Sequence, residues 1–134
     1  MSKRIYVDTN IYLDFILKRE GKYVDFAAEA ARLFKRAKDC EFEIILSDAV
    51  VAEYIGNFPS HEVELQSLRI LLSKKLIFIR KGVADVIASR DFATHAEDAL
   101  HIALAVRAGA DCIITRNLQD FMVSPIPARV PEGI

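Results

Sequence analysis

The chain has 134 residues, of which 52% are hydrophobic and 28% charged, and its formal net charge is -1. This length can bury one substantial core, so we predict a single domain over residues 1–134. The near-neutral charge excludes a protein that coats nucleic acid through its overall charge. Because no apolar stretch approaches the ~20 residues needed to cross a bilayer and the N-terminus lacks a signal-peptide pattern, we expect a cytoplasmic protein without a membrane partner.

Short apolar segments alternate with helical patterns along the chain. Strands are predicted, in chain order, at residues 4–8, 43–47, 76–80 and 112–115, with a weaker one near 126–130. Apolar residues at helical spacing predict helices at 26–37, 65–72, 83–92 and 97–108. This alternation is typical of βαβ units. We therefore predict an α/β fold, three layers (α/β/α) around a mostly parallel central sheet of four to five strands.

Three helix starts are predicted from residues that cap helices well. Ser60 is expected to cap the helix that contains 65–72, and Asp48 the helix that carries Glu53. Thr94 and Glu97 have the spacing of a capping box at the start of the helix at 97–108.

Polar residues gather where the predicted strands end. They are Asp8, Thr9 and Asn10 after the first strand, Ser47 and Asp48 after the second, and Thr115, Arg116 and Asn117 after the strand at 112–115. Glu53 and Asp98 lie on helices that begin near the same edge. Ligands of parallel α/β sheets bind beyond the carboxyl ends of the strands, so we expect these side chains to line one crevice.

Two of the three acidic residues also have a simple structural explanation. Asp8 could form an Asx-turn that opens the next helix, and Glu53 could lie on an exposed face of small residues. Asp98 is harder to explain, because it enters an almost entirely apolar helix, where a carboxylate without a cation or a donor is costly. For His101, one turn later, a hydrogen-bonded core histidine is favoured over a metal ligand or base.

Three carboxylates that converge without a cation repel one another. At ~5 Å and an effective dielectric constant of about 20, each pair costs roughly 3 kcal/mol. We therefore expect raised pKa values in the empty cluster. We also expect it to bind Mg²⁺ or Mn²⁺ through oxygen ligands.

The chain resembles the PIN domain family, particularly the VapC-like toxin ribonucleases. The resemblance rests on "VDTNIYLDF", "LSDAVVAEY" and "EDALHIALAVRAGADCIITRNLQDF", and it covers nearly the whole chain. It implies a Mg²⁺- or Mn²⁺-dependent endoribonuclease whose three main acidic positions are Asp8, Glu53 and Asp98. The family's fourth acidic position falls on Asn117, and Asp120 lies one helical turn later as the alternative.

The resemblance also implies roles and partners. A divalent ion held by Asp8 and Asp98 would activate a water, and Glu53 would orient this water or bind the ion. Thr115 would hold a carboxylate or a water through its hydroxyl group, and Asn10 would orient Asp8. The candidate contacts to RNA phosphates are Lys18, Arg19, Lys22 and Arg116. The implied partners are an RNA substrate, an antitoxin protein and a second copy of the chain in a homodimer.

Because Asn117 replaces a carboxylate, the alternative function is a weakened or inactive PIN domain that binds RNA or a protein. Two other enzyme classes fit poorly. A phosphoacceptor receiver domain needs a lysine where Arg116 follows Thr115, and a haloacid-dehalogenase-type phosphatase needs D-x-D where this chain has D-T-N.

Overall fold

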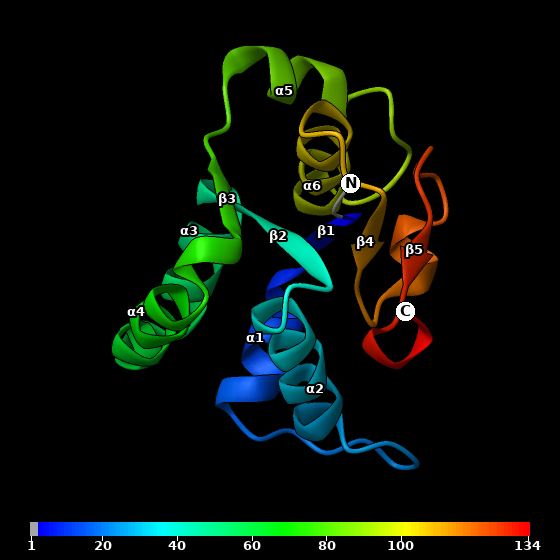
Figure 1. The fold of residues 1–134 in the computed structure, drawn as a ribbon. Coiled ribbons are helices and arrows are strands. Elements are labelled where there is room, and N and C mark those ends of the chain that lie inside the picture. Colours follow the sequence, from blue (N-terminus) through cyan, green and yellow to red (C-terminus); the bar gives the residue numbers. More distant parts are fainter. Residues whose placement is uncertain (1–2) are drawn as a thin grey trace.

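A computed structural model of the protein describes residues 3–134. Within this range the strands form one sheet (Figure 1), and they are β1 (Lys3–Val7), β2 (Phe42–Ser47), β3 (Leu76–Ile79), β4 (Cys112–Ile114) and β5 (Ala128–Arg129). Their order is β3-β2-β1-β4-β5, and all neighbouring strands are parallel. The predicted parallel sheet is therefore confirmed, and the weak strand near 126–130 is β5.

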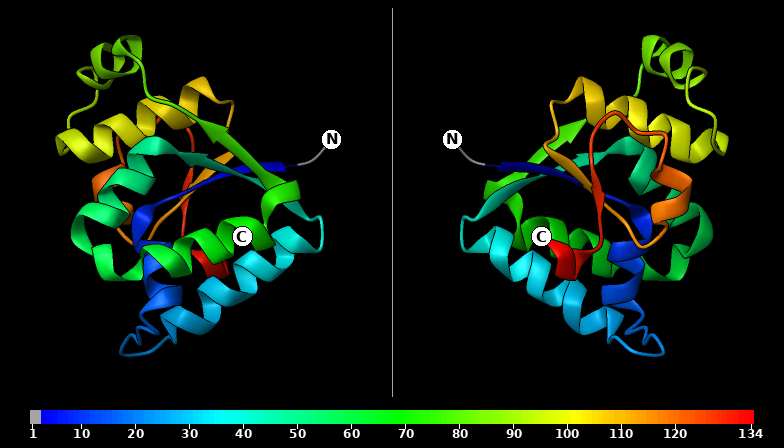
Figure 2. Two further views of the ribbon diagram at one scale, coloured as in Figure 1. Left: turned by 90° about the vertical axis from the view of Figure 1, so that its left-hand side faces the viewer. Right: turned by 90° about the vertical axis from the view of Figure 1, so that its right-hand side faces the viewer.

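The helices of this range are α1 (Thr9–Ile16), α2 (Phe26–Lys38), α3 (Asp48–Asn57), α4 (Glu62–Leu71), α5 (Val83–Ser89) and α6 (Ala96–Arg107). Figure 2 shows α5 and α6 on one side of the sheet and α1, α2 and α4 on the other, which confirms the three layers. None of these helices is long and apolar enough to cross a membrane.

The hydrophobic core lies on both faces of the sheet. Ile5, Tyr6 and Val7 of the central strand β1 are 0% exposed, as expected for a parallel strand that is covered by helices on both sides. Burying an aliphatic side chain of this size contributes ~1.5–3 kcal/mol. Helix α6 is apolar almost all round because it packs between this sheet and α5, and its Ile102 and Leu104 are also 0% exposed.

The strand order reverses between β1 and β4. The chain runs from β1 through β2 to β3, then returns to β4 and β5 on the other side of β1. In such sheets the crevice opens beyond the carboxyl ends of the two strands at this point. Asp8 directly follows β1, and its backbone N donates a hydrogen bond of 2.9 Å to the O of Ile114 in β4. The topology therefore places Asp8 beside the end of β4.

The predicted cap of α3 is wrong by one residue. Ser47 is the N-cap, because its hydroxyl accepts a hydrogen bond of 3.1 Å from the backbone N of Val50. Asp48 is instead the first helical residue. Its Oδ1 accepts a hydrogen bond of 2.8 Å from the backbone N of Lys81, so it ties α3 to the segment that follows β3.

The other two predicted caps are also wrong. Ser60 lies in the short 3₁₀ turn Pro59–His61, and α4 begins at Glu62 without a side-chain cap. The hydroxyl of Thr94 donates to the backbone O of Asp120 at 2.7 Å, and α6 starts without a side-chain cap. Thr94 is used in a long-range contact that sequence spacing does not reveal.

Candidate metal centre

Asp8 is a buried carboxylate with two fixed oxygens. Its Oδ1 accepts a hydrogen bond of 2.8 Å from the backbone N of Thr9, and its Oδ2 accepts one of 2.9 Å from the hydroxyl of Thr115. Asp8 is thus both the N-cap of α1 and a member of the crevice. Burial raises the pKa of its carboxyl group, and the positive potential of His101 only partly offsets this effect.

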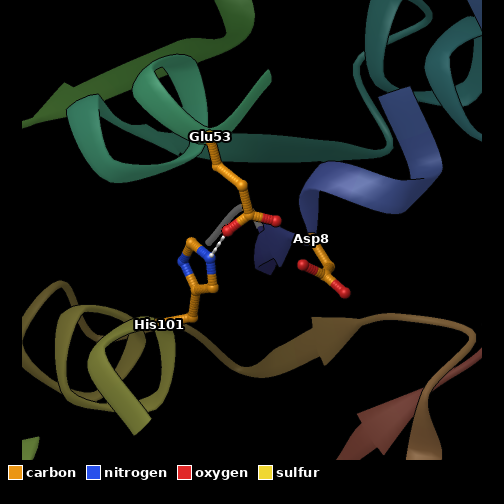
Figure 3. Close-up of side chains that lie close together, drawn as sticks. All are labelled: Asp8, Glu53 and His101. Carbon is orange, nitrogen blue, oxygen red and sulfur yellow. Dashed lines mark hydrogen bonds and ion pairs between the residues drawn. The ribbon is translucent and has the colours of Figure 1, made fainter. Parts of the chain in front are cut away.

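Glu53 approaches Asp8 from α3, and His101 approaches from α6 (Figure 3). Nε2 of His101 lies 3.1 Å from Oε2 of Glu53. The hydrogen bond from His101 holds the pKa of Glu53 below its usual value. The expectation that every carboxyl group of the empty cluster has a raised pKa is therefore wrong for Glu53, because His101 stabilises its ionised form.

Asp8, Glu53 and His101 each offer one ligand atom, and these three atoms lie within 4.8 Å of one another. Within residues 3–134, no other group of three or more His, Cys, Asp or Glu side chains converges closely enough to hold an ion. The strands and helices therefore bring together two of the three predicted ligands, Asp8 and Glu53, and add a histidine.

Asp98 lies in the first turn of α6, three residues before His101. Burial raises the pKa of its carboxyl group to about 6, and the negative charge of Asp8 is the next largest cause. Asp98 is not part of the tightest group, but its carboxyl group lies in the electrostatic field of that group. Asp98 is half-buried.

Asp120 also acts on Asp98, whereas Asn117 carries no charge. The charge of Asp120 adds to the rise in the pKa of Asp98. Asn117 is exposed, and its contact to the site runs through its backbone N, which donates to the hydroxyl of Thr115 at 3.0 Å. Of the two candidates for the fourth acidic position, Asp120 is thus the one whose charge acts on the cluster.

A cavity of about 280 Å³ opens beside the cluster. It is lined by Ala49, Ala52, Glu53, Lys81, Glu97, Leu100 and His101. The small residues on the Glu53 face of α3 thus leave open space. Of the residues that line this cavity, Lys81 is the one with a permanent positive charge, and it was not among the predicted RNA contacts.

Two of the four predicted RNA contacts, Arg19 and Arg116, line a different cavity. That cavity, of about 360 Å³, includes Asn10, Asp14, Arg19 and Arg116 in its lining. Arg116 is held there, because its guanidinium pairs with Glu132 at 2.9 Å and lies 4.0 Å from the centre of the Phe26 ring.

The remaining predicted residues are less constrained. Arg19 pairs with the buried Asp14 at 3.7 Å, whereas Lys18 and Lys22 are exposed between α1 and α2. Asn10 makes no side-chain hydrogen bond within residues 3–134, so the expected contact that orients Asp8 is absent. Asp8 is held by Thr9 and Thr115 instead.

Sequence reasoning missed the residues that support His101. Nδ1 of His101 lies 2.7 Å from the hydroxyl of Tyr6, which in turn lies 2.7 Å from the hydroxyl of Ser47. In the sequence, Tyr6 looks like an ordinary core residue of a strand, and Ser47 looks like the last residue of a strand. The preference for a hydrogen-bonded core histidine at 101 was the one signal that pointed to this network, and the burial and the hydrogen bonds of His101 are confirmed.

Comparison with known proteins gives the family. The family model described as PIN domain matches residues 4–119. A comparison with curated protein sequences finds no match.

Solved structures with the same fold include three from bacteria. A toxin-antitoxin complex from Klebsiella pneumoniae is 22% identical with a TM-score of 0.68, and the alignment covers 97% of this chain and 99% of that one. FitAcB from Neisseria gonorrhoeae is 19% identical with a TM-score of 0.65 and the same coverage. VapC20 of Mycobacterium tuberculosis, a sarcin-ricin loop cleaving toxin, is 17% identical with a TM-score of 0.64 over 91% and 95% of the two chains. The match over residues 4–119 shows that the chain belongs to the PIN domain family.

Proposed function

We propose that this protein is a Mg²⁺- or Mn²⁺-dependent endoribonuclease that hydrolyses phosphodiester bonds of RNA. The observation that carries the proposal is the convergence of Asp8 and Glu53 at the carboxyl edge of the sheet, within the field of Asp98. Membership of the PIN domain family supports the same reaction class.

The side chains of the cluster fit a hard divalent cation. Asp8 and Asp98 have raised pKa values because burial and repulsion by neighbouring carboxylates disfavour their ionised forms. A cation among them would relieve both effects, and carboxylate oxygens are the ligands that Mg²⁺ and Mn²⁺ prefer. We assign Asp8 and Asp98 as ligands, with Glu53 as a third ligand or as the group that orients the attacking water. A bound divalent ion would supply positive charge that makes a nearby water more acidic and stabilises charge on the phosphate.

The protein's own residues prepare this site. Thr115 and the backbone N of Thr9 fix both oxygens of Asp8, so its carboxylate needs no rearrangement before it binds. We propose that Asp120 adds negative charge beside Asp98 in place of the amide of Asn117. Lys81 would bind a phosphate group of the RNA in the cavity next to Glu53, since a lysine at the site positions a phosphate without reading sequence.

We also propose that the protein is the toxin of a toxin-antitoxin pair, with an antitoxin protein as its partner and a homodimer as its assembly. The support is the fold shared with the Klebsiella toxin-antitoxin complex and with the sarcin-ricin loop cleaving toxin.

Cleavage of a panel of single-stranded RNAs tests the proposed reaction. We expect cleavage with Mn²⁺ or Mg²⁺, none after chelation with EDTA, and a loss of cleavage in Asp98→Asn. The matched control is Asp91→Asn, which makes the same chemical change at an exposed position. Full cleavage in EDTA or in Asp98→Asn would contradict the proposal.

A second candidate function is favoured by Asn117. Where the family's fourth acidic position would fall, this chain has an exposed amide without a charge. A weakened or inactive domain would bind the same RNAs, or a protein, without cutting them. Retarded RNA in an electrophoretic binding assay, together with intact RNA after prolonged incubation with Mn²⁺, is the outcome expected of this alternative.

A further inference from the structure

A chain of buried hydrogen bonds joins the start of α3 to Glu53 on the same helix. The backbone N of Val50 donates to the hydroxyl of Ser47 at 3.1 Å, and this hydroxyl lies 2.7 Å from that of Tyr6. Tyr6 contacts Nδ1 of His101 at 2.7 Å, and Nε2 of His101 contacts Oε2 of Glu53 at 3.1 Å. Tyr6 and Ser47 are 0% exposed and His101 is 2% exposed, so water does not compete for these bonds.

The hydrogen bond between His101 and Glu53 determines which ring nitrogen of His101 carries a hydrogen. A carboxylate that binds a cation is ionised, and an ionised carboxylate only accepts hydrogen bonds. Nε2 of His101 must therefore donate to Glu53. A ring nitrogen that bears hydrogen has no lone pair for a metal, although the distances alone would allow His101 to be a ligand.

We propose that His101 is a positioning residue: its Nε2–H holds one oxygen of Glu53 and leaves the other for the divalent ion or its water, while Tyr6 holds the imidazole ring from behind. Figure 3 shows the second oxygen of Glu53 on the side of Asp8. This inference rests on the proposed function, since it gives Glu53 its orientation toward the ion. It removes nitrogen from the ligand set and leaves an all-oxygen site, which suits Mg²⁺ as well as Mn²⁺.

The hydrogen on Nε2 can be observed directly by nuclear magnetic resonance. The chain has three histidines, and the ring signals of His101 in ¹⁵N-labelled protein are assigned by their loss in His101→Gln. We expect a hydrogen on Nε2 in the metal-free protein and again after saturation with Mg²⁺, which does not broaden the signals. A hydrogen-free Nε2 in the Mg²⁺-saturated protein would make His101 a ligand and overturn the proposal.

Two buried tyrosines provide a matched test of the support behind His101. Tyr6→Phe removes the hydroxyl that contacts Nδ1, whereas Tyr12→Phe removes a hydroxyl that is equally buried but has no hydrogen-bond partner within residues 3–134. We expect Tyr6→Phe to weaken Mn²⁺ binding by about 3- to 10-fold. It should also lower kcat for RNA cleavage while KM stays unchanged. Tyr12→Phe should match the wild type in both, and equal effects of the two substitutions would overturn the proposal.

Substitution of His101 itself gives a second measurement if Tyr6→Phe does not fold. His101→Gln keeps an N–H near the position of Nε2, and His101→Phe removes it while keeping a ring. We expect His101→Phe to lose about 10- to 100-fold in Mn²⁺ affinity, as for other residues that orient a ligand, and His101→Gln to recover most of it. Equal losses in both variants would contradict the positioning role.

The failure of this inference can be told apart from the failure of the proposed function. If the wild-type protein binds no Mn²⁺ and cuts no RNA, both are wrong. If it binds Mn²⁺ and cuts RNA while Nε2 lacks hydrogen, the positioning role alone is wrong.

Discussion

The carboxyl group of Asp98 has a pKa of about 6, mainly because burial disfavours its ionised form, and then because of the charge of Asp8. An acid whose pKa is higher in the folded than in the unfolded protein binds more protons when folded. Between its unfolded pKa, near 3.8, and about 6, this group therefore makes the folded metal-free protein less stable as the pH rises. Above pH 6, ionised Asp98 lowers the free energy of unfolding by its full amount. Such a loss of stability on ionisation is expected of a carboxyl group at a cation site that holds no cation.

We predict that Asp98→Asn stabilises the metal-free protein at pH 7. The gain in the free energy of unfolding should be about 1 kcal/mol, less than the full pKa shift implies, because solvent screens a half-buried group. Thermal unfolding in EDTA at pH 7 and pH 5 measures it, and the gain should shrink at pH 5. Asp91→Asn, at an exposed position, should leave the melting temperature unchanged. A lower melting temperature in Asp98→Asn would contradict this account of the site.

Asp120 and Asn117 offer a second test at the residue scale. The charge of Asp120 acts on Asp98, whereas the side chain of Asn117 is exposed. We predict that Asp120→Asn lowers Mn²⁺ affinity by about 3- to 10-fold, since it removes one nearby charge, and that Asn117→Ala leaves it within error. Calorimetric titration of both variants measures this difference. The reverse order of effects would place the fourth position at Asn117.

At the scale of elements, the strands were predictable and several side-chain contacts were not. Uninterrupted apolar runs placed β1 to β4 within one or two residues, because a buried parallel strand needs apolar residues on both faces. The helix caps failed where Asp48 and Thr94 bond to residues far along the chain, Lys81 and Asp120. Such contacts depend on tertiary packing, and spacing in the sequence carries no trace of them.

The candidate site was likewise predictable only in part. Asp8 and Glu53 were found because an acidic residue after a strand, or on a face of small residues, stands out from its neighbours. The support from Tyr6 and Ser47 was missed because both residues fit a strand on their own account. The ion pair of Arg116 with Glu132 was also missed, because Glu132 comes from the short turn Pro131–Gly133, far along the chain.

The two ends of β3 carry lysines in different surroundings. Lys81 follows the strand at the carboxyl edge and lines the cavity beside Glu53, and its backbone is tied to Asp48. Lys74 precedes the strand, in the turn Ser73–Lys75 at the opposite edge. We predict that Lys81→Ala weakens RNA binding by about 10-fold and that Lys74→Ala does not, although both remove one positive charge. Fluorescence anisotropy with a labelled single-stranded RNA in EDTA measures the affinity, and equal effects would contradict a phosphate contact at Lys81.

For the whole molecule, the reversal of strand order between β1 and β4 explains where the site lies. The crevice at this point receives Asp8 from β1, Thr115 from the end of β4, Glu53 from α3 on one side of the sheet and His101 from α6 on the other. The fold could be predicted because alternating strands and helices leave few right-handed arrangements. The relative depth of each side chain in the crevice could not, because it depends on packing between layers.

The exposed surface bears on the proposed homodimer. Large apolar side chains are exposed on two helices, with Ile70 of α4 76% exposed and Val83 and Ile87 of α5 77% and 55% exposed. The two helices lie on opposite sides of the sheet (Figure 2), so these side chains form two separate exposed apolar sites, and a second copy of the chain could cover either one. We predict a mass of twice 15.1 kDa by size-exclusion chromatography with light scattering. A monomer at all concentrations tested would contradict the homodimer.

The central claim is that Asp8, Glu53 and Asp98 together bind a divalent cation, and calorimetric titration with Mn²⁺ at pH 7.5 tests it most directly. We predict saturable binding by the wild-type protein, and by Asp91→Asn, that is lost in Asp8→Asn and in Asp98→Asn. No binding by the wild-type protein, or unchanged binding in Asp8→Asn, would contradict the claim.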